Sequence, residues 1–534
     1  MMKKVIKKLL AALLAVAMVC AMAIPAFAGT EGDITKWHSF SAFQIFKGKV
    51  DGNDIKDFKI SNVEWGSNID PDNFLPQLKG ADTIGPLFTK ANSAQDVLEV
   101  ISKWSNSDAN SIAFARFVCH YLYPDANATP EPAVKGGGGS DHIHFDEAGY
   151  YLVVDTTPFN HGDFDHAYNS FLLMVTHEDW NIPITPKAEK PSVKKEVFDN
   201  FDNQDGTSTG DFGSSADHAI NEEFQFKLTA TLPASPDRAY DYYDTYAVCF
   251  KDTLSEGITY DGPDSVVIES KGNPGNRYDI TDSSTIDISK LESQNYFEVN
   301  IHDVKACAKD AGFDLNDGAT ITFTYTAHLN EKATVNTTSG PTDNKNSVQL
   351  QYSNNPRPGD YWGTTPKSEV YVFTYQLNNT KRAETENGTP LPGAGFKLYS
   401  DAECNNEVGL YQEGEFYYPI KDATGKKAVE MISGENGQFN VKGLDAGTYY
   451  LKETITPAGY DTCGVTPVTI KADHSGNDHV NLEGSNLTIV NKKAGGITLP
   501  STGGIGTTIF YVVGGGLMVA AIVLLVTKKR MENK

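Results

Sequence analysis

The sequence predicts a mostly β protein in which two tandem β-sandwiches follow a mixed α+β domain. Two observations support this fold class, and a third concerns the two ends of the chain. Aromatic residues make up 11% of the 534 residues, and many Thr, Val and Tyr residues accompany them, a composition that favours β-structure. From about residue 188 onward, short segments alternate apolar and polar residues between turns. Apolar segments at both ends have the form of export and anchoring signals.

The N-terminus has the parts of a secretory signal peptide. Four lysines among the first eight residues precede an apolar stretch from Leu9 to about Ala23. Ala26-Phe27-Ala28 then has the A-x-A form of a cleavage site. We therefore expect residues 1–28 to be removed and the exported protein to begin near Gly29.

Residues 29–187 are expected to form the mixed first domain. A strand is expected around residues 40–46, and a buried strand at Gly149–Asp155. One helix should follow Ser93, which begins an S-x-x-D capping box. A second helix, with apolar residues at helical spacing, should end before Pro124.

Two clusters near this domain resemble metal sites without completing one. His142 and His144 lie one residue apart and so share a strand face, and His161 and His166 follow. No Cys or carboxylate is spaced to close a zinc site with them. The acidic run from 199 to 206 lacks the D-x-D-x-D-G pattern of a calcium loop. We expect neither a metal nor another cofactor.

Residues 188–366 and 367–493 should form two antiparallel sandwiches, entered through a connector rich in Pro and Lys between Trp180 and Val197. Both regions consist of strand-like segments and turns. The segments that show this pattern are Phe224–Leu232, Tyr246–Phe250, Ile321–Ala327, Val348–Tyr352, Val370–Tyr375, Gly395–Tyr399, Gly447–Leu451 and Leu487–Ile489.

The C-terminal stretch, residues 494–534, carries a pentapeptide, an apolar run and a basic tail in that order. The pentapeptide is Leu499-Pro500-Ser501-Thr502-Gly503, and Pro500 keeps the backbone extended beside it. The run from Ile505 to Thr527 is 23 residues, long enough for a transmembrane helix. The basic residues after it should remain on the cytoplasmic side.

Charge and cysteine content exclude several classes of protein. The formal net charge is −24, and it falls to −31 without the four signal-peptide lysines and the net +3 that follows Gly503. Such a surface repels nucleic acid, so no nucleic-acid partner is expected.

Cys404 and Cys463 lie in one exported domain and are expected to pair. Cys249 with Cys307 is a second possible pair, which would leave Cys119 free.

Several of these stretches resemble sortase-assembled major pilins, the SpaA/FimA-type backbone subunits of Gram-positive bacteria. Phe40–Val50, Val63–Gly66 and Gly149–Val153 resemble the first domain of that family. The pentapeptide resembles the LPXTG sorting signal, which a sortase cleaves between residues corresponding to Thr502 and Gly503. The later sandwiches resemble immunoglobulin-like Cna-type domains, the last of them the CnaB type. The resemblance implies a structural pilus subunit on the cell wall, with a role in adhesion and colonisation.

The resemblance also implies partners. A class C sortase would join Thr502 to a lysine of the next identical subunit, head to tail. Trp180–Lys187 resembles the pilin motif that ends in Y-P-K, with Thr185 in place of Tyr, which implies Lys187 as the linking residue; Lys190 is the alternative. Accessory pilins, a housekeeping sortase that attaches the polymer to peptidoglycan, and host surface ligands are further implied partners.

Domains of this family form an amide between a Lys and an Asn side chain, their one single-turnover reaction. The reaction needs a neutral, buried Lys amine and a protonated acid beside the Asn carbonyl. Burial lowers the pKa of a Lys and raises that of a carboxylic acid. Reactive residues should therefore share a strand face with core residues.

The last sandwich satisfies this condition. Lys381 shares strand parity with Tyr375, and Asn491 with Ile489. Tyr449–Tyr460 resembles the family's Y-x-L-x-E-T-x-x-P-x-G-Y box, which implies Glu453 as the acid. The predicted set is Lys381, Glu453 and Asn491.

In the middle sandwich, Lys195 shares parity with Val197, and Asn346 with Val348. Asp252 resembles the family's strand-end D-x-L acid. The predicted set is Lys195, Asp252 and Asn346, with Lys194 and Asn354 as alternatives, and none is predicted for the first domain.

Two other functions compete with a pilus subunit. A monomeric wall-anchored adhesin, or an ancillary pilin, needs the sorting signal but not Lys187. A secreted hydrolase is disfavoured because the chain lacks G-x-S-x-G, H-E-x-x-H and Cys-His signatures. We therefore expect a structural protein and not an enzyme.

Overall fold

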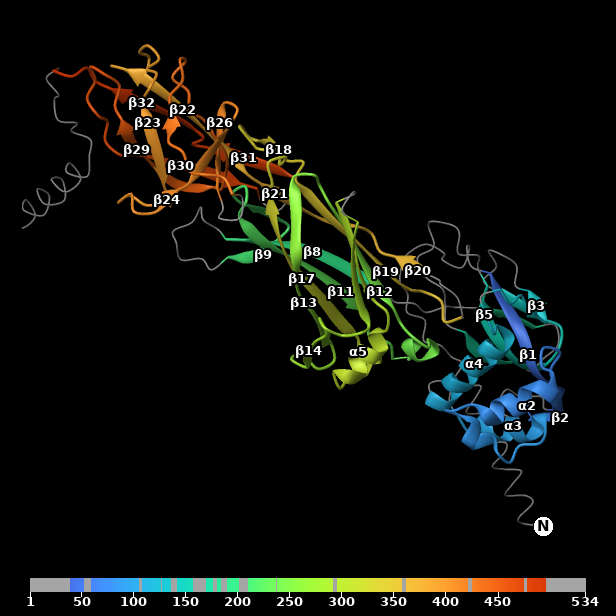
Figure 1. Ribbon diagram of the computed structural model, residues 1–534. Coiled ribbons are helices and arrows are strands. Elements are labelled where there is room, and N and C mark those ends of the chain that lie inside the picture. Colours follow the sequence, from blue (N-terminus) through green and yellow to red (C-terminus); the bar gives the residue numbers. More distant parts are fainter. Residues whose placement is uncertain are drawn as a thin grey trace, which may run out of the picture. The chain divides into compact units, whose positions relative to one another are not determined.

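The computed structural model describes most of the chain between residues 39 and 495 (Figure 1). The described residues are 39–51, 59–104, 108–125, 127–135, 142–156, 170–175, 180–183, 190–200, 210–236, 238–291, 295–357, 362–420, 425–474 and 478–495. The signal peptide, the pentapeptide, the apolar run after it, His161, His166 and Lys187 lie outside them. Among the described residues, no helix is long and apolar enough to cross a membrane.

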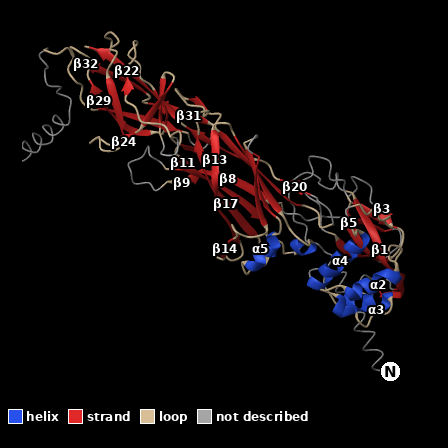
Figure 2. Cartoon of the chain, in the orientation of Figure 1, coloured by secondary structure: helices blue, strands red, loops and turns tan. Residues whose placement is uncertain are grey.

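The first domain combines a five-stranded sheet with helices. The sheet order is β2-β1-β5-β6, with β3 paired to β1. The strands of the domain are β1 (Phe40–Asp51), β2 (Lys59–Trp65), β3 (Val134–Lys135), β4 (His142–Phe145), β5 (Gly149–Asp155), β6 (Phe171–Val175) and β7 (Trp180–Pro183). The helices are α2 (Pro71–Gly80), η2 (Gly85–Phe88), α3 (Ala94–Ile101) and α4 (Ala109–Leu122). Figure 2 shows how the helices gather in this part of the chain.

Both faces of this sheet are covered. Phe43 and Leu152 share a buried cluster with residues of the helices, whereas Tyr151 and Val153 belong to a second cluster on the opposite face. Every residue of β5 is therefore buried, as the continuous apolar stretch predicts. Ser93 caps α3 by accepting a hydrogen bond from the backbone N–H of Asp96, as the capping box predicts.

The middle domain is a sandwich of two sheets. One has the order β10-β21-β19-β12-β16-β15, with β20 paired to β19, and the other β14-β13-β17-β11-β8-β9. The strands are β8 (Ser192–Asp199), β9 (Asp211–Gly213), β10 (Ser215–Asp217), β11 (Glu223–Leu232), β12 (Val248–Leu254), β13 (Ile258–Ser270), β14 (Arg277–Asp279), β15 (Ile286–Leu291), β16 (Tyr296–Ile301), β17 (Ala319–Leu329), β19 (Lys345–Ser353), β20 (Trp362–Thr364) and β21 (Ser368–Phe373). Its short helices are η3 (Ala239–Tyr242), α5 (Val304–Asp310) and η5 (Leu315–Asp317).

In this sandwich, the alternation of apolar and polar residues in the sequence corresponds to an alternation of buried and less buried side chains. Along β17 every second residue is buried, and β11, its antiparallel neighbour, shows the same pattern. β21 begins two residues after the predicted boundary at 366, yet it pairs with β19 and β10. The middle sheet therefore extends past that position.

The last domain has one sheet in the order β25-β26-β28-β22-β32 and another in which β30-β29-β23-β24 follow one another, with β27 on β23. The strands are β22 (Tyr375–Ala383), β23 (Gly395–Tyr399), β24 (Glu407–Val408), β25 (Leu410–Glu413), β26 (Phe416–Pro419), β27 (Met431–Ile432), β28 (Val441–Leu444), β29 (Gly447–Ile455), β30 (Thr466–Asp473) and β32 (Asn486–Asn491). β31 (His479–Glu483) pairs with the C-terminal end of β30 and with β18 (Gly340–Pro341).

The chain divides into two compact units. The first contains residues 1–376, 443–447 and 470–483, and the second contains 377–442, 448–469 and 484–534. The three residues predicted for the middle sandwich all lie in the first unit, and the three predicted for the last sandwich all lie in the second.

Candidate functional site

Lys195 points from β8 into the core of the middle sandwich. Its side chain is completely buried, and its Nζ lies 5.0 and 5.2 Å from the ring centroids of Phe226 and Tyr325. The amine donates hydrogen bonds to Asp252 Oδ2 and, over 3.1 Å, to the Tyr325 hydroxyl. β8 places Lys195 inward because Val197, two residues on, fills the same core face.

Asp252 and Asn346 reach Lys195 from the opposite sheet. β12 and β19 are antiparallel neighbours, and their register pairs Asp252 with Val348 and Leu254 with Asn346. Asn346 Nδ2 donates to the Tyr325 hydroxyl over 2.5 Å. Its Oδ1 is buried and has no hydrogen-bond partner among the described residues. The Asn346 amide oxygen is therefore available to accept a hydrogen bond from a protonated acid during amide formation.

Burial dominates the electrostatics of this site. Loss of hydration lowers the pKa of Lys195 to about 8, against the opposing attraction of Asp252. Loss of hydration likewise raises the pKa of Asp252 above its ordinary value, and that of Tyr325 well above 10. Both shifts favour the neutral forms, an unprotonated amine and a protonated acid, that amide formation requires.

Lys381, Glu453 and Asn491 meet in the core of the last sandwich. Lys381 Nζ donates to Asn491 Oδ1 over 2.5 Å, and Asn491 Nδ2 donates to Glu453 Oε1 over 2.7 Å. Glu453 Oε1 also lies 3.4 Å from Lys381 Nζ, and the Lys381 and Glu453 side chains are completely buried. One carboxylate oxygen thus contacts both the amine and the amide nitrogen.

The strands position this second group differently. β22 and β32 are parallel neighbours, so Lys381 and Asn491 approach along one sheet. Glu453 comes from β29 in the other sheet. The backbone N–H of Cys463 donates to Glu453 Oε2 over 2.8 Å, and Cys463 Sγ lies 3.6 Å from Lys381 Nζ.

The alternative residues fit less well. Lys194 is exposed and forms an ion pair of 2.7 Å with Glu196. Asn354 is buried, with both amide atoms lacking partners among the described residues, but no contact joins it to Lys195. Lys190 is exposed, whereas Lys187 lies outside the described residues.

The predicted disulfide between Cys404 and Cys463 is wrong, because both are free thiols in the structure. Cys404 follows the Tyr399 end of β23, where Tyr399 pairs with Tyr450. Cys463 lies beside Glu453, whose partner Phe396 is three positions away along the same ladder. The two sulfurs have different neighbours: Cys404 Sγ lies 3.9 Å from the backbone carbonyl oxygen of Ala402, whereas Cys463 Sγ lies 3.6 Å from Lys381 Nζ.

The second possible disulfide is also absent. Cys249 and Cys307 are buried free thiols, Cys249 on β12 and Cys307 on α5, and Cys307 Sγ lies 3.3 Å from Thr285 Oγ1. Cys119 is a free thiol as expected, buried in α4. Small sandwich domains with extensive cores can be stable without such cross-links.

Tyr325 is the functional candidate that the sequence analysis missed. Its hydroxyl contacts Lys195 and Asn346 and lies 3.4 Å from Asp252 Oδ1, so it links all three predicted residues. The signal was present in the sequence, because Tyr325 is the one hydroxyl-bearing residue at an inward position of the alternating stretch from 321 to 327.

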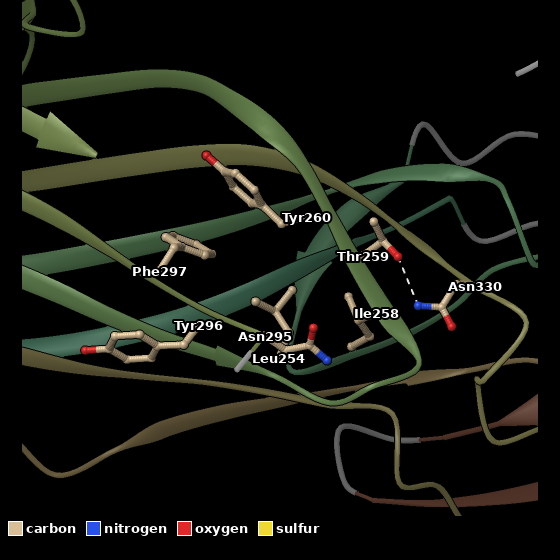
Figure 3. Close-up of a pocket in the computed structure, with 8 residues that line it drawn as sticks. All are labelled: Leu254, Ile258, Thr259, Tyr260, Asn295, Tyr296, Phe297 and Asn330. Atoms are coloured by element: carbon tan, nitrogen blue, oxygen red, sulfur yellow. Dashed lines mark hydrogen bonds between the residues drawn. The ribbon is translucent and has the colours of Figure 1, made fainter. Parts of the chain in front are cut away.

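A cavity of about 330 Å³ lies beside this middle site. Figure 3 shows Tyr260 and Phe297 among its lining residues, together with the hydrogen bond from Asn330 to Thr259. The rings of Tyr260 and Phe297 pack 5.2 and 5.1 Å from that of Tyr325. Leu254, which also lines the cavity, pairs with Asn346.

Two family models match the C-terminal part of the chain. Residues 377–492 match the SpaA model, described as a prealbumin-like fold domain, and residues 491–533 match that of the LPXTG cell wall anchor motif. The matches confirm the mostly β fold class, the resemblance to this group of Gram-positive surface proteins and the location at the cell wall.

Curated relatives match over part of their length. The chain is 25% identical over 293 residues to the trypsin-resistant surface T6 protein of Streptococcus pyogenes serotype M6, covering 51% of this chain and 44% of that protein. It is 31% identical over 182 residues to serine-aspartate repeat-containing protein C of Staphylococcus aureus, covering 32% of this chain and 18% of that protein. The chain thus spans less than half the length of each.

Similar solved structures include two pilins. One is the T6 backbone pilin of serotype M6 Streptococcus pyogenes, at 16% identity over 86% of this chain and 97% of that chain, with a TM-score of 0.45. The other is the full-length major pilin SpaD from Corynebacterium diphtheriae, at 20% identity over 70% and 88% of the two chains, with a TM-score of 0.41.

Proposed function

We propose that this chain is the backbone subunit of a covalently polymerised, cell-wall-anchored pilus, stabilised by internal amide bonds between Lys and Asn side chains. The observation that carries the proposal is the burial of a complete Lys, acid and Asn set in each of two consecutive sandwiches. An unpaired lysine is costly to bury. Each of these two fully buried lysines has an acid and an asparagine beside it, which supports an internal amide in each sandwich.

The proposed reaction joins Nζ of the lysine to Cγ of the asparagine. The neutral amine attacks the amide carbon while a protonated acid stabilises the carbonyl oxygen. A proton then passes to the amide nitrogen, the bond from that nitrogen to Cγ breaks, and ammonia leaves. One carbon–nitrogen bond forms and one breaks, so no oxidant or cofactor is needed.

In the last domain, Glu453 is suited to the proton transfer. Its Oε1 lies 3.4 Å from the attacking nitrogen and 2.7 Å from the leaving nitrogen. A single oxygen can therefore accept a proton from Lys381 and deliver it to the departing ammonia.

In the middle domain, Asp252 receives the proton of Lys195, and the Tyr325 hydroxyl connects both to the Asn346 amide. The cavity beside Leu254 offers ammonia a space next to the site.

Polymerisation is the second part of the proposal. A class C sortase would cleave after Thr502 and join it to Lys187 of the next identical subunit, and a housekeeping sortase would attach the last subunit to peptidoglycan. Accessory pilins and host surface ligands are the expected companions. Lys190, exposed just before β8, is the competing linking residue.

A denaturing gel of cell-wall extract tests the polymer. The proposal expects a ladder of high-mass species, and a single band would instead indicate a monomeric wall-anchored adhesin. Lys187→Arg should abolish the ladder while leaving the protein on the wall, and the matched variant Lys190→Arg should keep it. A ladder that survives Lys187→Arg and disappears with Lys190→Arg would reassign the linking residue.

The internal bonds are tested separately by intact mass. The chain from residue 29 to Thr502 should be lighter than its sequence mass by about 34 Da, because each amide releases one ammonia of about 17 Da. A mass equal to that of the sequence would overturn both bonds without affecting the ladder experiment.

A further inference from the structure

A third polar cluster lies away from both lysine sites. His218, Glu222 and Asp445 each offer one ligand atom, and these atoms all lie within 4.8 Å of one another. Asn200 Nδ2 also donates to Glu222 Oε1 over 3.4 Å and to Asp445 Oδ2 over 3.2 Å. All these residues belong to the first compact unit, which includes residues 443–447.

The His218 ring is fixed in a way that directs a lone pair into this cluster. Its Nε2 lies 2.7 Å from the backbone carbonyl oxygen of Phe198, which can only accept, so Nε2 carries the proton. The ring also stacks on Phe224 at 4.2 Å, and its side chain is 2% exposed. In the neutral imidazole, Nδ1 therefore bears the lone pair.

Nδ1 of His218 has no hydrogen-bond partner among the described residues. It lies 3.7 Å from Glu222 Oε1, beyond hydrogen-bond distance. A buried lone pair that faces a carboxylate is unfavourable unless a positive species lies between them. This arrangement points to a bound cation and not merely to a group of acids.

A backbone group fixes each of the two carboxylates, as the Phe198 carbonyl oxygen fixes the His218 ring. Each of these contacts lies on the side away from the cluster. Glu222 Oε2 accepts the N–H of Ala219 over 3.0 Å, and Asp445 Oδ1 accepts the N–H of Ala446 over 2.8 Å. Each group thus has one atom anchored to the backbone and another directed toward the common centre. Outer contacts of this kind orient the ligands of metal sites.

A neighbouring cluster shows what a protonated histidine looks like here. His474 lies with Nε2 3.4 and 3.7 Å from Asp199 and Asp217 carboxylate oxygens, and with Nδ1 2.8 Å from Ser215 Oγ. Burial opposes the charged ring, but Asp217 and Asp199 outweigh it and raise the pKa of His474. An imidazolium ion pair explains that cluster without a metal.

We propose that His218 Nδ1, Glu222 Oε1 and Asp445 Oδ2 bind a divalent transition-metal ion of the Zn²⁺ type. An imidazole with two carboxylates suits Zn²⁺ better than Ca²⁺ or Mg²⁺, which take oxygen ligands almost exclusively. With metal–ligand bonds of about 2.0–2.2 Å, the ligand atoms must approach one another by roughly 1 Å. Glu222, partly exposed at 34%, is the ligand most able to move.

A metal at this cluster differs from the expectation, drawn from the sequence, that the chain binds none. Ligands at close spacing, such as His142 and His144, can be recognised in a sequence, whereas His218 and Asp445 are 227 positions apart. Only the fold brings such ligands together.

Zinc uptake by the chelator-treated mature protein tests the site. After dialysis against ZnCl₂, the wild type should retain one more Zn²⁺ per chain than His218→Gln or Asp445→Asn. Zn²⁺ should also raise the Tm of the wild type, and chelation should reverse the rise. His474→Gln, in the neighbouring cluster, and His302→Gln, an exposed histidine, should retain the wild-type stoichiometry.

Equal Zn²⁺ uptake by the wild type and by His218→Gln would overturn the proposal. So would a Tm rise with CaCl₂ that matches the rise with ZnCl₂ and persists in His218→Gln. If His218→Gln does not fold, Glu222→Gln replaces it, because its side chain is partly exposed. It should also retain one Zn²⁺ fewer per chain than the wild type.

Discussion

The two sandwiches bring the same three kinds of residue together by different strand arrangements. In the middle domain, Lys195 faces Asp252 and Asn346 across the gap between two sheets. In the last domain, Lys381 and Asn491 lie on neighbouring parallel strands, and Glu453 comes from the opposite sheet. The amide would tie sheet to sheet in one case and strand to strand in the other.

The contacts differ accordingly. Lys381 touches the amide oxygen of Asn491 directly, whereas Lys195 meets its acid first and is connected to Asn346 through Tyr325. The two sites therefore share a buried amine beside an acid and differ in how that amine contacts the asparagine.

Removing the acids should give the largest effect. Asp252→Ala and Glu453→Ala should each restore about 17 Da to the intact mass and lower the free energy of unfolding of their domain by about 5 kcal/mol, the loop-closure estimate. The loss should be greater for Asp252→Ala, which leaves the Lys195 amine with only a hydroxyl partner. Denaturant unfolding, together with the intact mass, measures the free energy of unfolding lost in each variant. Equal losses in the two variants would contradict the expected difference between the sites.

When the amide cannot form, the buried amine of Lys195 should make the free energy of unfolding depend on pH. Burial lowers the pKa of Lys195 to about 8 in the folded protein, below its ordinary 10.5, and in Asn346→Ala the lysine should keep this depressed pKa because it stays buried. Between these values the unfolded chain binds more protons, so the free energy of unfolding should rise from pH 8 to 10.5 by on the order of 3 kcal/mol. The wild type, whose Nζ would be an amide, is the control. A flat profile for the variant would argue against a buried amine.

Tyr325→Phe should slow bond formation in the middle domain alone. It removes the hydroxyl that connects Lys195 and Asn346 but keeps the packing of the ring. A slowing of about 100-fold is expected, the size of a lost proton-transfer contact. A time course of intact mass after refolding would measure it, with Tyr240→Phe as the matched control for a buried tyrosine. A wild-type rate would show that the hydroxyl is structural only.

Cys463→Ala should have the smallest effect. The thiol touches Lys381, but Glu453 is held by the backbone N–H of Cys463, which the substitution retains. We expect the bond to form fully and the free energy of unfolding to change by less than about 1 kcal/mol. Incomplete bond formation would make Cys463 part of the proton pathway. The same sample should show one thiol fewer than the wild type, which should have five under denaturing conditions once the signal peptide with Cys20 is removed.

The alternation of inward and outward residues along each strand predicted many of the strands and the inward position of both lysines. The register between strands could not be predicted from it. Alternation located β11 and β17, and it assigned Lys195 and Lys381 to the core face. Parity does not show how far along a strand two inward residues meet, because that depends on the pairing between strands. The neighbours Leu254 and Asn346, and therefore the role of Tyr325, follow from register alone.

Membership in one domain did not determine whether two cysteines meet. Cys404 Sγ lies beside the Ala402 carbonyl oxygen, whereas Cys463 Sγ lies beside Lys381 Nζ. The His218 cluster was missed for a similar reason, since its ligands come from distant segments that only the fold assembles.

The positions of the proposed amides would limit how far a single subunit can lengthen under tension. Lys381 and Asn491 are 110 positions apart, and 151 positions separate Lys195 from Asn346. Extended, these segments would span about 380 and about 530 Å. If each segment is closed by an amide at its base, none of that contour length can be drawn out under tension, even where the hydrogen bonds within the segment are lost.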